Sequence, residues 1–61
     1  MKAHPAETAM VERAARRELV WVDEPGRPSY LAKLLFWGSR PKVILASGAV
    51  KYVAQEDVRV K

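Results

Sequence analysis

The segment LVWVDEPGRPSYLAKL, residues 19–34, carries the clearest structural signal of this chain. Branched and aromatic residues stand on both sides of a Pro/Gly turn, which is typical of two short β-strands joined by a loop. Downstream, the turn-forming segments GSRPK and ASG separate further apolar runs. We therefore predict strands over residues 19–22, 30–37, 42–46, 49–54 and 58–60.

Upstream of residue 19 the composition favours a helix. Pro5 is tolerated in a first helical turn, Glu7 lies near the positive helix end, and Met10 and several alanines follow at loosely helical spacing. We predict a helix from about Pro5 to Arg17. Its apolar stripe is mostly alanine and therefore shallow, so the helix could pack on the strands, pair with a second copy or fray. Packing is the expected outcome.

Five short strands with tight connections favour a closed antiparallel barrel, because closure removes the sheet edges that a small open sheet exposes. The expected fold class is therefore mainly β, a small five-stranded barrel with one N-terminal α-helix. The chain divides into an N-terminal tail and helix, residues 1–18, and the barrel, residues 19–61.

The strand at residues 30–37 defines two faces, because side chains alternate along a strand. Lys33 marks the outer face. The predicted inner side chains are Tyr30, Ala32, Leu34 and Phe36. The outer face then also holds the apolar residues Leu31, Leu35 and Trp37. Such an apolar surface is larger than a soluble monomer usually leaves uncovered, so we expect the helix or a second copy to cover it.

The composition excludes several classes of protein. The chain has 61 residues, no cysteine and one histidine, so a disulfide framework is excluded and a zinc site lacks ligands. A domain of this size buries only about 60% of its unfolded surface, and self-association is one remedy for a small core. No apolar run is long enough to cross a bilayer, and the first residues lack the apolar region of a secretory signal. We expect a cytoplasmic protein without metal or cofactor.

The residues do not support catalysis by a monomer. The three serines have only His4 as an imidazole partner, and His4 stands in the tail before the helix. The adjacent carboxylates at residues 23–24 and 56–57 diverge on a strand or turn, and no Gly-rich phosphate loop is present. We predict that the protein is not an enzyme.

The positive charge is concentrated in the second part of the chain. The net charge is +4, and residues 1–24 are nearly neutral, whereas residues 25–61 have seven basic side chains and two acidic ones. This balance is expected of a protein that contacts phosphates, and it is equally typical of a solvated, soluble surface.

For DNA or RNA, the candidate residues are basic side chains beside aromatic ones. Trp37 and Tyr52 are possible stacking platforms. The candidate cations are Arg27, Lys33, Arg40, Lys42 and Lys51. In the alternative interpretation Trp37 packs under the helix, Tyr52 fills a barrel edge and the lysines are only solvated.

The order of residues 19–60 resembles the Tudor-type branch of the SH3-like barrels. The matching elements are Val20–Trp21, Tyr30–Leu34, Val43–Leu45 with Ser47–Gly48, and Val53 with Asp57–Arg59. In family members that bind methylated lysine or arginine, about four aromatic rings form a cage around the cation. Trp21 and Tyr30 resemble two walls of that cage, and Ala46 and Ala49 stand where the remaining rings would be. The resemblance therefore implies only a partial aromatic groove.

A module that binds proteins is the competing class. Leu31, Leu35 and Trp37 on the outer face could contact a protein partner or a second copy. The helix arginines, Arg13, Arg16 and Arg17, could join the basic surface in either scheme, or could pair with Glu12 and Glu18. The sequence favours a non-catalytic binding module, with nucleic acid as the first ligand and a protein as the alternative.

Overall fold

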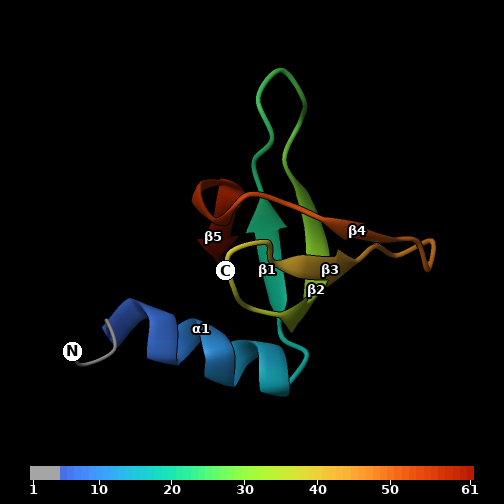
Figure 1. The fold of residues 1–61 in the computed structure, drawn as a ribbon. Helices are drawn as coiled ribbons and strands as arrows, with labels where there is room; N and C mark the ends of the chain where they lie inside the picture. The colour runs from blue at the N-terminus through green and yellow to red at the C-terminus, as the bar shows by residue number, and fades with distance from the viewer. Residues whose placement is uncertain (1–4) are drawn as a thin grey trace.

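The computed structural model describes residues 5–61, and it is mainly β with one N-terminal helix (Figure 1). The predicted tail with His4 lies outside these residues. The elements are α1 (Pro5–Ala15), β1 (Leu19–Val22), β2 (Tyr30–Phe36), β3 (Lys42–Ile44), β4 (Val50–Tyr52), the 3-10 turn η1 (Gln55–Asp57) and β5 (Val58–Val60). The mainly β class, the five strands and the single N-terminal helix predicted from the sequence are confirmed. No helix within residues 5–61 has the length and apolar character needed to cross a membrane.

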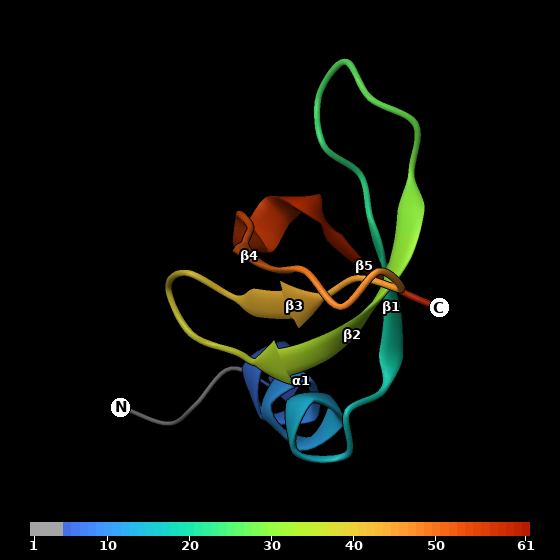
Figure 2. The same cartoon turned by 90° about the vertical axis from the view of Figure 1, so that its right-hand side faces the viewer.

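The five strands form one antiparallel sheet in the order β4-β3-β2-β1-β5. The sheet is strongly curled around its inner face (Figure 2). Within the described residues no strand pairing joins β4 to β5, so the sheet stays open where the sequence predicts a closed barrel. β4 and β5 have only three residues each, and the segment between them forms η1 instead of continuing either strand.

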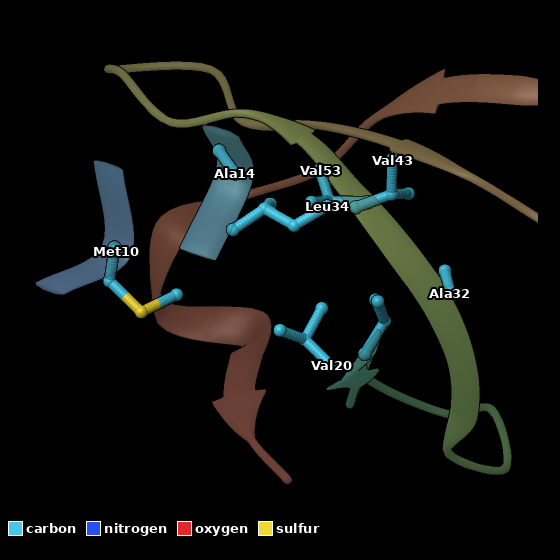
Figure 3. Packing of buried hydrophobic residues seen from close by; sticks show 8 residues of the cluster. Met10, Ala14, Val20, Ala32, Leu34, Val43 and Val53 are labelled. Carbon is cyan, nitrogen blue, oxygen red and sulfur yellow. The ribbon is translucent and has the colours of Figure 1, made fainter. Parts of the chain in front are cut away.

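The core lies between the inner face of the sheet and α1. Leu34, Val20, Val22 and Val43 are completely buried there. Met10 and Ala14 of α1 belong to the same buried cluster, and Figure 3 shows them facing it. The helix therefore packs on the strands as predicted. However, it covers the inner face and leaves the outer face, with Leu31 and Lys33, uncovered.

The helix ends at Ala15, two residues before the predicted end, because Arg17 adopts a left-handed backbone with φ of 57°. The N–H of Arg17 donates to the carbonyl of Ala14, and the N–H of Glu18 donates to that of Arg13, both at 3.1 Å. This is the Schellman pattern of a helix C-terminus. The Arg17 guanidinium also donates to the carbonyls of Ala14, at 3.1 Å, and Leu35, at 2.7 Å, so it ties the helix to β2.

A β-bulge in β2 changes the faces predicted for its end. Leu34 pairs with Val43 and Phe36 pairs with Lys42, so Leu35 is an extra residue opposite β3. One extra residue reverses the alternation of side chains that follow it. Phe36 is consequently 55% exposed, while Trp37 is partly buried against the core. The predictions of an inward Phe36 and an outward Trp37 are wrong for this reason.

The third and fourth strands are shorter than predicted because residues 45–49 form the turn between them. The N–H of Leu45 donates to the carbonyl of Ala49 at 2.8 Å, and the N–H of Gly48 donates to the carbonyl of Leu45 at 2.9 Å. Gly48 has φ of 93°, which side chains disfavour, so a glycine suits this position.

Candidate functional site

The outer face of the sheet, which α1 does not cover, carries a row of aromatic and basic side chains. Residues paired directly across antiparallel strands point to the same face. Lys42 of β3 pairs with Phe36 on one side and with Tyr52 on the other. Phe36 is 55% exposed and Tyr52 is 56% exposed. We call Phe36, Lys42 and Tyr52 the aromatic row.

A second row lies beside the aromatic row on the same face. The strand pairing places Leu19, Lys33, Ile44 and Val50 opposite one another. Leu19 and Val50 are exposed although they are apolar. A groove follows the first three of these residues, and Leu31, Leu45, Ala46 and Gly48 also line it. We call Leu19, Lys33, Ile44 and Val50 the apolar row.

Both rows are electrostatically positive. They contain Lys33 and Lys42 and no carboxylate, and neither lysine forms an ion pair within residues 5–61. The Lys42 ammonium lies 5.8 Å from the centre of the Tyr52 ring, where it makes a cation-π contact. Arg40 is exposed in the loop that joins Phe36 to Lys42. The strand pairing thus places Lys33 and Lys42 on one side of the sheet.

Arg27 does not belong to this surface. It lies in the loop between β1 and β2, which extends away from β3 and β4 (Figure 1). The exposed Arg27 is separated from the aromatic row by the length of the hairpin. A ligand on the outer face would therefore not need Arg27.

Lys51 is engaged elsewhere. It pairs with Val43, which is completely buried in the core, so it points to the inner side of the sheet. Its ammonium lies 2.9 Å from a Glu24 carboxylate oxygen and 5.6 Å from the centre of the Tyr30 ring. Hydrogen bonding to Lys51 lowers the pKa of Glu24, and the same bond raises the pKa of Lys51. This lysine holds the loop against β4 and is not available to the outer face.

Trp21 and Tyr30 do not form a common groove. Tyr30 pairs with Val22, the neighbour of Trp21, so the two rings stand on opposite faces of the sheet. Tyr30 packs against the core and faces Lys51. Trp21 has the guanidinium of Arg59 5.5 Å from its ring centre. Each ring already contacts a cation of this chain, and the two rings lie on opposite faces. They therefore do not form the partial aromatic groove that the resemblance implies.

The adjacent carboxylates Asp23 and Glu24 connect the start of the β1–β2 loop to the two edge strands of the sheet, β5 and β4. Asp23 Oδ2 accepts a hydrogen bond from Arg59 Nε of β5 at 2.8 Å, and Asp23 also accepts one from Ser29. Glu24 binds Lys51 of β4. The two side chains thus diverge, as the sequence predicts. Asp23 contacts β5 and Glu24 contacts β4, the two edge strands that do not pair with each other within the described residues.

These ion pairs predict an acid-sensitive fold. The bond to Arg59, then that to Ser29, lowers the pKa of Asp23 below its ordinary 3.8, and Lys51 lowers that of Glu24 below 4.5. A carboxylate whose pKa is lowered by folding stabilises the protein above its ordinary pKa, and the contribution is lost as the pH falls through the folded value. The melting temperature should therefore decrease as the pH is lowered below about 4.5. This decrease should be smaller in the double variant Asp23→Asn/Glu24→Gln.

The measurement is thermal unfolding by circular dichroism across this pH range. Glu56→Gln is the matched control, because Glu56 is an exposed carboxylate outside the ion pairs of residues 5–61. The control should keep the wild-type pH dependence. Equal slopes in the wild type and the double variant would show that the two tethers do not contribute to acid sensitivity.

The helix arginines are occupied by local partners. Arg13 lies 3.8 Å from Glu18, and Arg16 lies 4.0 Å from Glu12 and 3.2 Å from Glu18. Arg17 binds backbone carbonyls. Of the two alternatives left open by the sequence, the pairing with Glu12 and Glu18 is the one that the structure contains.

The predicted apolar contact surface is only partly on the outer face. Leu31 lines the outer groove, whereas Leu35 is the extra residue of the bulge and Trp37 turns to the core. Sequence reasoning missed Phe36 because strict alternation placed it inside. Gly38 is the local signal that was available: a Cβ at this position would lie 2.7 Å from the Phe36 ring, so the glycine leaves room for the exposed ring.

The chain matches no protein-family model, and neither the curated proteins nor the solved structures contain a significant match. The resemblance to the Tudor-type barrels therefore stays a prediction. Within residues 5–61 no cluster of three or more histidine, cysteine, aspartate or glutamate side chains has the arrangement of a metal site. The candidate site rests on the two rows of the outer face.

Proposed function

We propose that this protein is a small, basic, non-catalytic module that binds nucleic acid on the outer face of β2, β3 and β4. The observation that carries the proposal is the aromatic row, in which two rings that are more than half exposed flank a lysine. Exposed rings beside basic side chains are the usual elements of base stacking combined with phosphate contact. Lys33 extends the positive surface on β2, and Arg40 is exposed in the adjoining loop. The cytoplasmic location stays a prediction.

The contact between Lys42 and Tyr52 is compatible with this role. A cation-π contact at an exposed site is worth about 0.5–1 kcal/mol. Stacking of one base on an aromatic ring is worth about 1–3 kcal/mol. A base can therefore displace the ammonium from the ring at a net gain, and the displaced ammonium is then free to contact a neighbouring phosphate. The same side chain thus protects the ring in the free protein and binds phosphate in the complex.

A protein-binding or self-associating module is the second candidate. The apolar row and the groove beside it favour it, because Leu19 and Val50 are exposed next to the half-buried Ile44. The unpaired edge of β4 would add backbone hydrogen bonds to such a contact. The lysines in both rows argue for the nucleic acid, since they repel a second copy of the same positive surface.

The proposal predicts a salt-dependent affinity that depends on the outer-face lysines. Labelled DNA and RNA are titrated at two or more salt concentrations with the wild type and with Lys33→Ala/Lys42→Ala. Each lost phosphate contact lowers the log-log salt slope by about 0.7–0.9, so the double variant should lose about 1.5 units and bind less tightly at low salt.

The control for charge is Arg16→Ala, which removes a cation that Glu12 and Glu18 already pair. It should keep the wild-type slope. Failure of the wild type to bind any nucleic acid at low salt would overturn the proposal. Binding with a slope that the lysine variant leaves unchanged would place the interface elsewhere on the protein.

A further inference from the structure

We infer that the ligand of the outer face is single-stranded rather than double-stranded nucleic acid; this inference rests on the proposed function. The aromatic row joins β2, β3 and β4 in register, so Phe36 and Tyr52 stand two strands apart. Neighbouring strands are separated by about 4.8 Å, which puts the two ring positions roughly 10 Å apart. Lys42 lies between them. The row offers two separate ring surfaces with one cation in the middle.

This arrangement fits unstacked bases. Both residues are more than half exposed, and the two rows contain no carboxylate. The ammonium of Lys42 lies over the Tyr52 ring, so a base stacks there by displacing it. Two bases held roughly 10 Å apart cannot remain stacked on each other, since adjacent bases in a helix are about 3.4 Å apart. A strand with splayed bases can place one base on each ring and the phosphate between them near Lys42.

A duplex cannot use the same rings. Its base faces are hidden inside the stack, and only phosphates, sugars and groove edges are accessible to a protein. Reading a major groove requires a helix or a two-stranded ribbon that enters it. α1 packs on the inner face with Met10 and Ala14, and the loop between β1 and β2 extends away from β3 and β4 (Figure 1). On the two rows a duplex would therefore meet the cations Lys33 and Lys42 but not the ring faces.

The support for the rings also matches a stacking role. Gly38 leaves the space beside Phe36 that a Cβ would occupy, which keeps the ring at the surface. Lys42 holds its ammonium over Tyr52. Both rings are positioned by contacts within the chain, so less conformational entropy is lost when a base stacks on them.

The experiment compares three labelled probes with the full chain: an oligothymidylate and an oligouridylate of about twelve nucleotides, and a DNA duplex of matched length. The variants are Phe36→Ala/Tyr52→Ala and, as control, Val60→Ala. Val60 is 44% exposed on β5 and pairs with Val20 of the inner face, so its loss removes apolar surface outside the aromatic row. Far-ultraviolet circular dichroism establishes that each variant is folded.

The wild type should bind the single strands roughly tenfold or more tightly than the duplex, and the double variant should lose this preference while keeping its affinity for the duplex. Val60→Ala should behave as the wild type. The comparison of thymidylate with uridylate identifies whether DNA or RNA is preferred. The inference is overturned if the duplex binds as tightly as the single strands, or if the ring variant keeps the preference.

Those two results would leave nucleic-acid binding in place. Absence of binding by all three probes would instead remove the proposed function itself. Sedimentation velocity on the same samples tests whether a second copy of the chain binds this face. A wild-type dimer that dissociates in Phe36→Ala/Tyr52→Ala would show that the rings contact a second copy, and this too would overturn the inference.

Discussion

Replacing Leu34 by alanine is expected to lower the free energy of unfolding by about 3–4 kcal/mol, the largest effect of any single change considered for this protein. Leu34 is completely buried, with 0% of its surface exposed, and it lies in the cluster that joins β1, β2, β3 and α1. The substitution removes three side-chain carbon atoms and leaves a cavity that flanking strands cannot fill. Both losses destabilise the folded state.

The size of the chain makes this loss severe. Native domains have about 0.05–0.15 kcal/mol of stability per residue, which gives about 3–9 kcal/mol for a chain of this length. The variant should therefore be partly or wholly unfolded at 25 °C. Urea denaturation followed by circular dichroism measures the change.

Leu19→Ala is the matched control, because Leu19 is the same residue type with 44% of its surface exposed. Its cost should stay below about 1 kcal/mol, since less apolar surface is lost and no cavity forms. If Leu34→Ala and Leu19→Ala cost the same, the core does not lie where the structure places it.

The elements of the fold were predictable because their signals are local. Pro5 and the alanines define the helix, and turn residues such as Gly26 and Gly48 separate the strands. The helix end was not predictable in the same way. Arg17 takes a left-handed conformation that glycine usually adopts, and its side chain is held by carbonyls of α1 and of β2. The β2 carbonyl is a tertiary contact, and such contacts are not visible in a local pattern.

The outer-face site was predictable in part. Strand alternation places Lys33 on the outer face, and the sequence offers Lys42 as a candidate cation and Tyr52 as a candidate stacking platform. Phe36 was missed because one bulge residue reverses the faces, and nothing in the composition of β2 marks the bulge. The engagement of Lys51 with Glu24 joins residues that are distant in sequence. Pairing of this kind depends on the curl of the sheet, so the sequence alone left Lys51 among the candidate cations.

The second large effect is expected at Trp37, and it separates structure from binding. Trp37 is partly buried against the core, and it lines a hollow with Val11 of α1 and Gln55 of η1. Replacing it by alanine should lower the free energy of unfolding by about 2–3 kcal/mol, less than for a fully buried tryptophan. Thermal or urea unfolding measures this loss.

Trp37→Phe distinguishes the two roles that the sequence allows. The indole N–H is buried and has no hydrogen-bond partner within residues 5–61, so its removal abolishes an unsatisfied donor. Phenylalanine keeps most of the apolar contact, and we expect a cost of less than about 1.5 kcal/mol. Because Trp37 faces the core while Phe36 and Tyr52 face outward, Trp37→Phe should bind nucleic acid as the wild type does. A folded Trp37→Phe protein with impaired single-strand binding would instead show that Trp37 belongs to the stacking surface. The proposed site of Phe36 on β2 and Tyr52 on β4 would then be wrong.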